Sequence, residues 1–184
     1  ASLMHTAPHV TAVFEADLSA VLKHRAANKE VFAGAGTPLT LTVYFVAAAI
    51  AAIRKVPRVN SRWTDEHLEV FHHVNMGIGT ALGDEGLIVP VLKQAQGMDL
   101  EGIAAGLADL TTRARDNALK PEDVRDGTFT ISNHGVSGSL IATPIIINQP
   151  QSAILGVGKI EKRTKILEVD GEDVISIRPM CYIS

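Results

Sequence analysis

Residues 129–160 read "FTISNHGVSGSLIATPIIINQPQSAILGVGKI", with three chemically capable side chains in a row near the start. Apolar and hydroxyl residues alternate in "FTISN", which is the period of a β-strand with one buried face. The glycine-rich "GVSGS" at 135–139 follows as a loop, where we expect close packing of the backbone. A second apolar run, "AILGVGKI", resumes the β pattern. Ser132, Asn133 and His134 therefore lie where a predicted strand ends.

The hydroxyl of Ser132 allows three interpretations. A serine nucleophile needs a base within hydrogen-bond reach, whereas a donor to a developing oxyanion needs only the right placement. His134 would share the Ser132 face of an extended strand at about 6–7 Å along the chain, which is too far for a direct hydrogen bond. The third interpretation is a polar strand end without chemistry. Physical reasoning on this stretch alone leaves all three open.

The other segments predict a mixture of strands and helices. Strands are expected in "PHVTAVFEADLS" (8–19), at 68–80, in "LIVPVLK" (87–93), and in "GTFTISN", "AILGVGKIEKRTKILEV" and "VISIRPMCYIS". Helices are expected at about 18–31, from Pro38 to Val56, and within 97–121, with Asp17, Thr37 and Asp99 as N-caps. Pro57 should end the second helix, "GDEG" (83–86) should form a tight turn, and Pro90 indicates an edge strand or a bulge. Without a strict βαβ rhythm, this pattern predicts an α/β fold, a two-layer α+β sandwich with helices packed on a mixed sheet.

Composition excludes several classes of protein. The 184 residues fit one domain, and the hydrophobic share of 46% argues against disorder. A net charge of −3 without a basic block gives no sign of nucleic-acid binding. The longest apolar stretch, at 41–53, is shorter than the roughly 18–20 residues that span a bilayer, so no membrane segment is predicted. The single Cys181 excludes an internal disulfide framework and fits a reducing compartment.

Metal and nucleotide motifs are missing from the sequence. Of the seven histidines only His5 and His9 lie four residues apart, and no helix is predicted there; the adjacent His72 and His73 would point to opposite faces of a strand. The glycines of "GIGTALGDEG" lack the GxGxxG spacing of a dinucleotide fold, and no phosphate loop or GxSxG elbow occurs. We therefore predict no metal site, no nucleotide fold and no hydrolase nucleophile.

The opening stretch, with "FTISN-G" and "TPII-N-PQ-AILG", closely resembles the catalytic core of the dihydrolipoyl acyltransferase components of 2-oxo acid dehydrogenase complexes. The segments "APHVTAVFEADLSAV", "VPRVNSRW" (56–63) and "GLIVPVLKQA" (86–95) match the same family in the family's order, so the resemblance covers essentially the whole chain. Within the family, "GSL" followed by "TPIIINQPQSAILG" is most similar to the succinyltransferase of the 2-oxoglutarate dehydrogenase complex, in the tricarboxylic acid cycle.

This resemblance implies a chloramphenicol-acetyltransferase-like fold and a homotrimer that builds a larger hollow core. Coenzyme A and a lipoyl group carried on a separate domain would meet in a channel between subunits, without a metal. The implied partners are the 2-oxo acid dehydrogenase and dihydrolipoamide dehydrogenase components, with no nucleic acid or membrane. The implied location is the bacterial cytoplasm or, in a eukaryote, the mitochondrial matrix.

Residue by residue, the match makes Ser132 the oxyanion donor and implies that Asn133, Gly135, Leu87 and Pro90 bind substrate. Asn133 is also expected to shape the strand end. His134 is expected to be a bystander, because it lies on the wrong strand to be the general base. In the family, that base belongs to a His-Arg-x-x-Asp-Gly motif expected just beyond residue 184.

Residues 1–184 are therefore expected to be one acyltransferase catalytic domain, incomplete at both ends and inactive alone. Two alternatives stand beside this interpretation. A non-catalytic core subunit of the same complex would bind partner enzymes without transferring acyl groups. A free antibiotic acetyltransferase would share the fold, but such enzymes do not carry the "TPII-N-PQ-AILG" stretch and are disfavoured.

Overall fold

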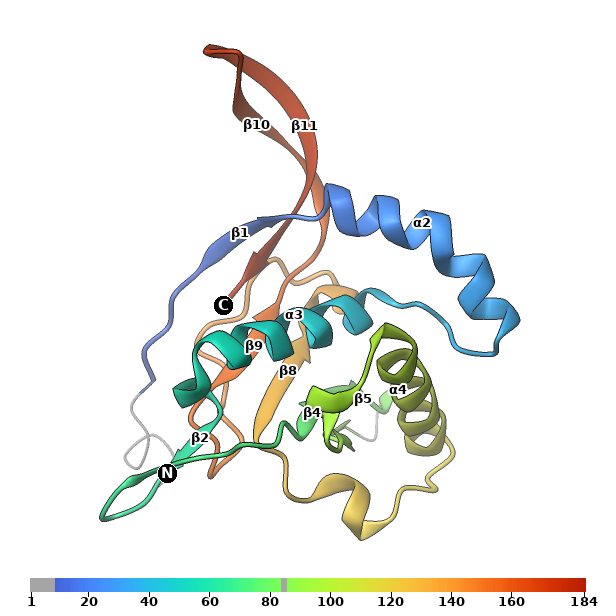
Figure 1. The fold of residues 1–184 in the computed structure, drawn as a ribbon, viewed down its shortest axis with the longest axis vertical. Helices are drawn as coiled ribbons and strands as arrows, with labels where there is room; N and C mark the ends of the chain where they lie inside the picture. Colours follow the sequence, from blue (N-terminus) through green and yellow to red (C-terminus); the bar gives the residue numbers. More distant parts are fainter. Residues whose placement is uncertain (1–8, 84–85) are drawn as a thin grey trace. The chain divides into compact units, whose positions relative to one another are not determined.

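The computed structural model describes residues 9–83 and 86–184, and Figure 1 shows the course of the chain. The chain forms two compact units. Unit 1 comprises Ala1–Ala20, Asn133–Ile146 and Gly156–Ser184, and unit 2 comprises Val21–Ser132 and Ile147–Leu155. Among the described residues, no helix is long and apolar enough to cross a membrane.

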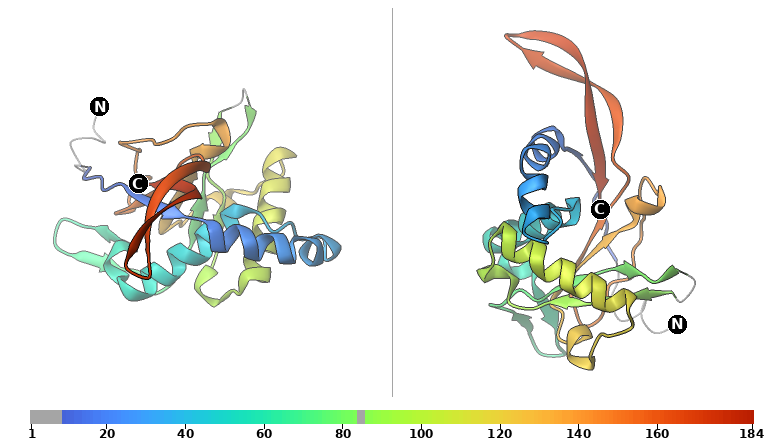
Figure 2. Two further views of the ribbon diagram at one scale, coloured as in Figure 1. Left: turned by 90° about the horizontal axis from the view of Figure 1, so that it is seen from above. Right: turned by 90° about the vertical axis from the view of Figure 1, so that its right-hand side faces the viewer.

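Two helices of unit 2 pack against each other through apolar stripes. They are α3 (Leu41–Lys55) and α4 (Leu100–Arg115) (Figures 1 and 2). The buried residues of α4 recur every three or four positions, as expected for one face of a helix: Ile103, Ala104, Leu107, Leu110 and Ala114. The carboxylate of Asp99 accepts a hydrogen bond of 2.8 Å from the Gly102 N–H. The predicted N-cap of α4 is therefore confirmed.

The beginning of α3 differs from the prediction. The helix starts at Leu41 after Thr40, not at Pro38. Thr37 instead belongs to the end of the preceding helix, α2 (Ser19–Gly34), because its hydroxyl donates to the Phe32 carbonyl at 3.2 Å. At its other end α3 stops at Lys55, before Pro57, as predicted. A proline fixes where a helix must stop more firmly than where it must start.

Unit 2 also contains a mixed sheet. Its strand β4 (Met76–Ile78) runs parallel to β8 (Phe129–Asn133) and antiparallel to β7 (Val91–Leu92). The register places Gly77 opposite Thr130. Pro90 directly precedes β7 and separates it from β6 (Leu87–Ile88). A proline is expected at such a break, because it cannot donate a hydrogen bond to a neighbouring strand. The predicted mixed sheet with helices is confirmed.

The single long strand predicted at 68–80 is wrong. The structure has three short strands there: β3 (Leu68–Val70), β4 and β5 (Thr80–Ala81). β3 pairs with β2 (Ser61–Trp63), and β5 pairs with β6. The break before β4 is stabilised by Asn60, whose buried amide donates to the carbonyls of Phe71 (3.1 Å) and His73 (2.9 Å). The alternating pattern at 68–80 could not reveal these hydrogen bonds, because Asn60 lies outside that segment. Of the predicted turn at 83–86, residues 84 and 85 lie outside the described residues.

The strands of unit 1 are β1 (Phe14–Asp17), β10 (Glu161–Val169), β11 (Glu172–Ile183) and the end of β9 (Ile154–Val157). β11 lies between β1 and β10 and pairs antiparallel with both. The strand predicted from residue 8 begins only at Phe14, which pairs with Ile183 at the end of β11. Val10 is 97% exposed, so alternation there does not reflect a buried face. The carboxylate of Asp17, the predicted cap of α2, accepts from the Ser19 N–H at 2.8 Å.

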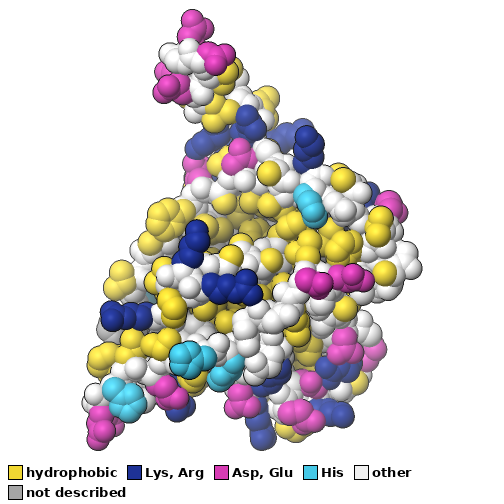
Figure 3. Space-filling view, viewed as in Figure 1, with side chains coloured by type: hydrophobic (Ala, Val, Ile, Leu, Met, Phe, Trp, Pro, Cys, Tyr) yellow, Lys and Arg dark blue, Asp and Glu magenta, His cyan; other side chains and the backbone are white. Residues whose placement is uncertain are grey.

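The hairpin of β10 and β11 is a long two-stranded ribbon (Figure 2). Acidic side chains gather at its outer end, with hydrophobic ones behind them (Figure 3). The cross-strand pair Ile166 and Ile175 is exposed by 68% and 74%, and Ile177 by 70%.

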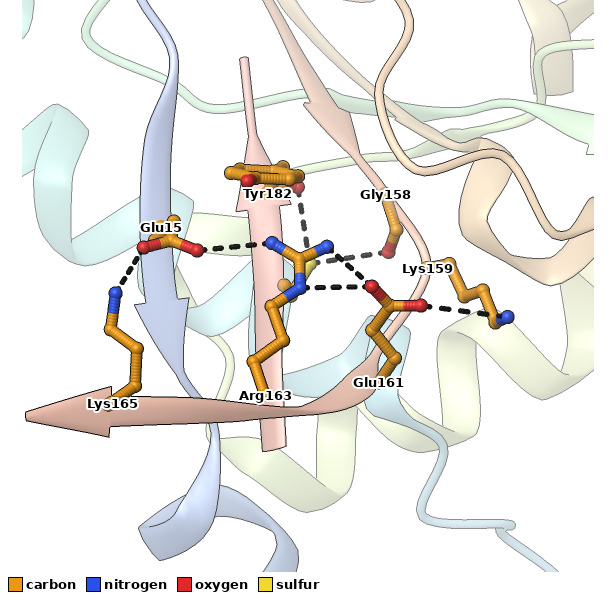
Figure 4. A network of polar contacts seen from close by, with 8 residues as sticks. Glu15, Gly158, Lys159, Glu161, Arg163, Lys165 and Tyr182 are labelled. Carbon is orange, nitrogen blue, oxygen red and sulfur yellow. Dashed lines mark hydrogen bonds and ion pairs between the residues drawn. The ribbon is translucent and has the colours of Figure 1, made fainter. Parts of the chain in front are cut away.

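A charged network holds β1 and β10 together across β11 (Figure 4). Arg163 on β10 makes ion pairs with Glu15 on β1 at 3.1 Å and with Glu161 at 2.9 Å, and Lys165 also pairs with Glu15. The Arg163 guanidinium lies 4.1 Å from the ring centroid of Tyr182, a residue of β11. The guanidinium thus binds two carboxylates and one aromatic face at once.

Candidate active site at the end of strand β8

Ser132 is placed by the pairing of β8 with the chain around β4. The Gly79 N–H donates to the Ile131 carbonyl at 2.9 Å, which extends the ladder by one step beyond β4. A Cβ atom at Gly79 would lie 3.7 Å from the Ser132 Cα and 3.9 Å from the Leu87 Cδ1. Gly79 therefore lies between two of the predicted site residues and brings them close together.

The hydroxyl of Ser132 is available for chemistry. The residue is half-buried, and no described residue forms a hydrogen bond with its side chain. Leu87 beside it is 67% exposed. A hydroxyl without a protein partner next to an exposed apolar side chain can donate to an incoming carbonyl oxygen.

Two glycines of β4 and its extension face two hydroxyl residues of β8. Gly77 lies opposite Thr130, and Gly79 lies beside Ser132. A Cβ atom at Gly77 would come within 2.9 Å of the Thr130 Oγ1. These glycines were missed as site residues, although the GxG at 77–79 and the alternating hydroxyls of "FTIS" carried a signal.

Pro90 has a different setting from Leu87. Its side chain is less than 2% exposed, and its carbonyl accepts the Ile78 N–H at 2.9 Å. This bond aligns the chain before β7 with β4. Pro90 thus shapes the strand on the far side of β4 from β8, and its contact with substrate stays a prediction.

Asn133 and Gly135 form the junction where the strand stops. Asn133 is the last residue of β8, and the 3₁₀-helix η5 (His134–Ser137) begins directly after it. A Cβ atom at Gly135 would lie 2.3 Å from the Gly158 carbonyl oxygen, which no side chain could accommodate. The expected close packing of the backbone is confirmed at Gly135. A role in substrate binding stays a prediction for both residues.

His134 is a shielded histidine. Both ring nitrogens are buried, and a Cβ atom at Gly156 would lie 3.5 Å from the Nε2. Burial lowers the pKa of His134, and a backbone contact with Ser139 acts in the opposite direction as the smaller of the two causes. Burial thus favours the neutral form of the imidazole. Its expected role as a bystander stays a prediction.

Metal ligands do not gather in the described part of the chain. No group of three or more His, Cys, Asp or Glu side chains lies close enough there to hold a metal ion. The chemistry that the described residues offer at the end of β8 is hydrogen-bond donation by a hydroxyl.

Residues 2–184 match the family described as 2-oxoacid dehydrogenases acyltransferase (catalytic domain), and the chain belongs to this family. A curated relative is the dihydrolipoyllysine-residue acetyltransferase component of the pyruvate dehydrogenase complex of Staphylococcus aureus. It is 40% identical over 171 residues, which cover 92% of this chain and 39% of that protein. The counterpart in Staphylococcus epidermidis is 41% identical with the same coverage. The chain thus spans about two fifths of the length of these relatives.

Solved structures agree with this family. The probable dihydrolipoamide acetyltransferase of Listeria monocytogenes superposes with a TM-score of 0.91 at 33% identity, covering 99% of this chain and 76% of that one. The cubic core of the pyruvate dehydrogenase multienzyme complex gives 0.87 at 29% identity, covering 97% and 72%. A chloramphenicol acetyltransferase, at 15% identity and a TM-score of 0.58, covering 96% and 77%, shows a shared fold alone. The predicted chloramphenicol-acetyltransferase-like fold is confirmed.

The predicted subfamily is not supported. The relatives named above are acetyltransferases of pyruvate dehydrogenase complexes, not succinyltransferases of 2-oxoglutarate dehydrogenase complexes. The motifs "GSL" and "TPIIINQPQSAILG" therefore identify the family without fixing the acyl group.

Proposed function

We propose that this chain is the acyltransferase part of a 2-oxo acid dehydrogenase complex and transfers an acyl group between dihydrolipoamide and coenzyme A. The observation that carries the proposal is the family match over residues 2–184, with Ser132 of the family's motif at the end of β8 and its hydroxyl without a hydrogen-bond partner among the described residues.

In the proposed reaction, the thiolate of one substrate attacks the thioester carbonyl of the other. The carbonyl π electrons move to oxygen, and the Ser132 Oγ–H donates a hydrogen bond to the resulting oxyanion. Collapse of the tetrahedral intermediate re-forms the carbonyl and expels the second thiolate, which takes up the proton. Ser132 forms no covalent bond to the acyl group. The base that deprotonates the attacking thiol is assigned to the family's His-Arg-x-x-Asp-Gly motif, which residues 1–184 do not contain.

We assign acetyl, not succinyl, as the transferred group, on the names of the curated relatives. The proposed partners are the 2-oxo acid dehydrogenase and dihydrolipoamide dehydrogenase components and a lipoyl domain. The proposed assembly is a homotrimer within a larger core, because one similar structure is the cubic core of a pyruvate dehydrogenase complex. Coenzyme A is a substrate in this reaction and not a resident cofactor.

The acyl choice is tested with the full-length protein that contains these residues. Transfer from acetyl-coenzyme A and from succinyl-coenzyme A to dihydrolipoamide is followed under identical conditions. We expect a higher kcat/KM for the acetyl donor. A higher value for the succinyl donor would restore the succinyltransferase interpretation. No transfer from either donor, by protein that is folded and assembled, would favour the non-catalytic core subunit.

A further inference from the structure

A buried hydrogen bond joins β8 to a distant segment of unit 2. The Thr130 Oγ1 donates to the Gln151 Oε1 at 2.6 Å. Thr130 is 3% exposed and Gln151 is 5% exposed. A short hydrogen bond between two shielded side chains is directional, and leaving either partner unsatisfied is costly. This bond therefore fixes the position of β8 more sharply than apolar packing does.

Gln151 is itself held firmly on its other side. Its backbone forms an isolated antiparallel bridge with Arg62 of β2. The next residue, Ser152, donates its N–H to the Ser61 carbonyl at 3.0 Å, and the hydroxyls of the two serines lie 3.1 Å apart. Gly127 leaves room for the amide, since a Cβ atom there would lie 3.0 Å from the Gln151 Nε2. The backbone of Gln151 is thus held by β2, while its side chain reaches β8.

Thr130 and Ser132 lie on the same face of β8, because side chains two residues apart in a strand point the same way. Gly77 leaves room for the Thr130 hydroxyl, and Gly79 lies beside the Ser132 backbone. The two hydroxyls have different partners. The Thr130 hydroxyl donates to Gln151, while the Ser132 hydroxyl has no hydrogen-bond partner among the described residues.

From this arrangement we infer that Gln151 is a positioning residue. Its hydrogen bond with Thr130 fixes the position of β8, and the position of β8 determines where the Ser132 hydroxyl lies. The inference rests on the proposed function. An oxyanion donor must lie about 2.7–3.1 Å from the developing charge, and a displacement of about 1 Å can cost roughly 100-fold in rate. Gln151 touches no reacting atom and acts only through the strand that carries Ser132.

The test uses the full-length protein and steady-state acetyl transfer. Thr130→Val removes the donor while keeping the shape, and Gln151→Met removes the acceptor at similar size. We expect either variant to lower kcat by roughly 10-fold to 100-fold, with KM for both thiols little changed. Thr130→Ser keeps the hydroxyl and should retain a parental kcat. Thr128→Val is the matched control, because Thr128 is also 3% exposed and hydrogen-bonds Asn75 before β8 begins.

Rates are normalised to the folded fraction of each variant. If a single variant does not fold, Thr130→Val combined with Gln151→Met leaves neither partner unsatisfied and takes its place. The reduced kcat should persist in this pair, because an apolar contact lacks the direction of a hydrogen bond. A kcat that falls as far in Thr128→Val as in Thr130→Val would overturn the inference, since a general loss of stability would then account for it.

A double-mutant cycle with Ser132→Ala separates this inference from the proposed function. If Gln151 acts through Ser132, Thr130→Val should change kcat by less than about twofold once Ser132 is alanine. A full additional loss in that background would overturn the inference. A reduced kcat in Ser132→Ala together with a parental kcat in Thr130→Val would overturn the inference about Gln151 and leave the proposed function intact. A parental rate for Ser132→Ala would overturn both the inference and the role of Ser132 as oxyanion donor, while acyl transfer itself would stand.

Discussion

Ser132 depends on residues that have almost no side chain. Gly79 brings the backbone beside it close enough for Leu87 to approach, and Gly77 makes the same space for Thr130. Sequence motifs identified Ser132 but not these neighbours, because a glycine in a strand has no chemistry of its own. Its effect is visible only when the opposite strand is known.

The two glycines should differ in their tolerance to alanine. At Gly77 a Cβ atom would lie 2.9 Å from the Thr130 Oγ1 and 3.0 Å from the Val89 Cγ1, so both side chains would have to move. At Gly79 the nearest atom would be 3.5 Å away, an ordinary contact. We expect Gly77→Ala to lower the free energy of unfolding by about 1–3 kcal/mol in urea titrations, and Gly79→Ala by clearly less. Equal losses would contradict the described packing.

His134 should make stability depend on pH. Its folded-state pKa is lowered by burial, so the unfolded chain, with a pKa of about 6.5, binds the proton more readily. The stabilising contribution is present above about pH 6.5 and is lost as the pH falls through the lower folded-state pKa. Urea unfolding between pH 7.5 and pH 5 should show a smaller loss of stability in His134→Gln than in the parent. The control is His72→Gln, which changes an exposed residue. A loss in His134→Gln as large as in the parent would remove His134 as the cause.

At the scale of elements, local signals predicted helices better than strands. α4 followed from its cap at Asp99 and its apolar stripe, both of which lie within the helix itself. The run at 68–80 alternates as one strand, yet it divides because Asn60 binds the carbonyls of Phe71 and His73. A strand exists only where a partner pairs with it, and no local pattern identifies that partner.

The charged network of unit 1 should make β1 sensitive to acid. Hydrogen bonds from Lys165 and Arg163 lower the pKa of the Glu15 carboxyl below its usual 4.5. Its contribution is therefore present above about pH 4.5 and is lost as the pH falls through the lower folded-state pKa. By hydrogen exchange, Glu15→Gln should reduce protection of the β1 amides at pH 6, and the difference from the parent should shrink towards pH 3.5.

Glu168→Gln is the matched control for this experiment, because Glu168 is an exposed carboxylate on the same hairpin. Its β1 amides should exchange like those of the parent. Unchanged β1 protection in Glu15→Gln at pH 6 would show that the network does not hold this strand.

For the whole molecule, the sequence predicted the class of fold and the family but not the acyl group. Two residues of the family hallmarks, Gln151 and Gly135, make structural contacts, a hydrogen bond to Thr130 and close packing against Gly158, and these contacts give no information on the acyl group. The proposed oxyanion donor could be found from the motif because Ser132 lies on β8 itself. The residues that position it come from β4 and from residues 147–155, far away in the sequence.

The most direct test of the proposed mechanism is the turnover of Ser132→Ala in the full-length protein, measured as acetyl transfer between coenzyme A and dihydrolipoamide. Thr64→Ala is the control, because it removes a half-buried hydroxyl from the turn between β2 and β3. We expect kcat to fall on the order of 100-fold to 1,000-fold in Ser132→Ala with KM for the thiols little changed, because one oxyanion donor is lost. Parental turnover in a folded Ser132→Ala protein would contradict the role given to this hydroxyl.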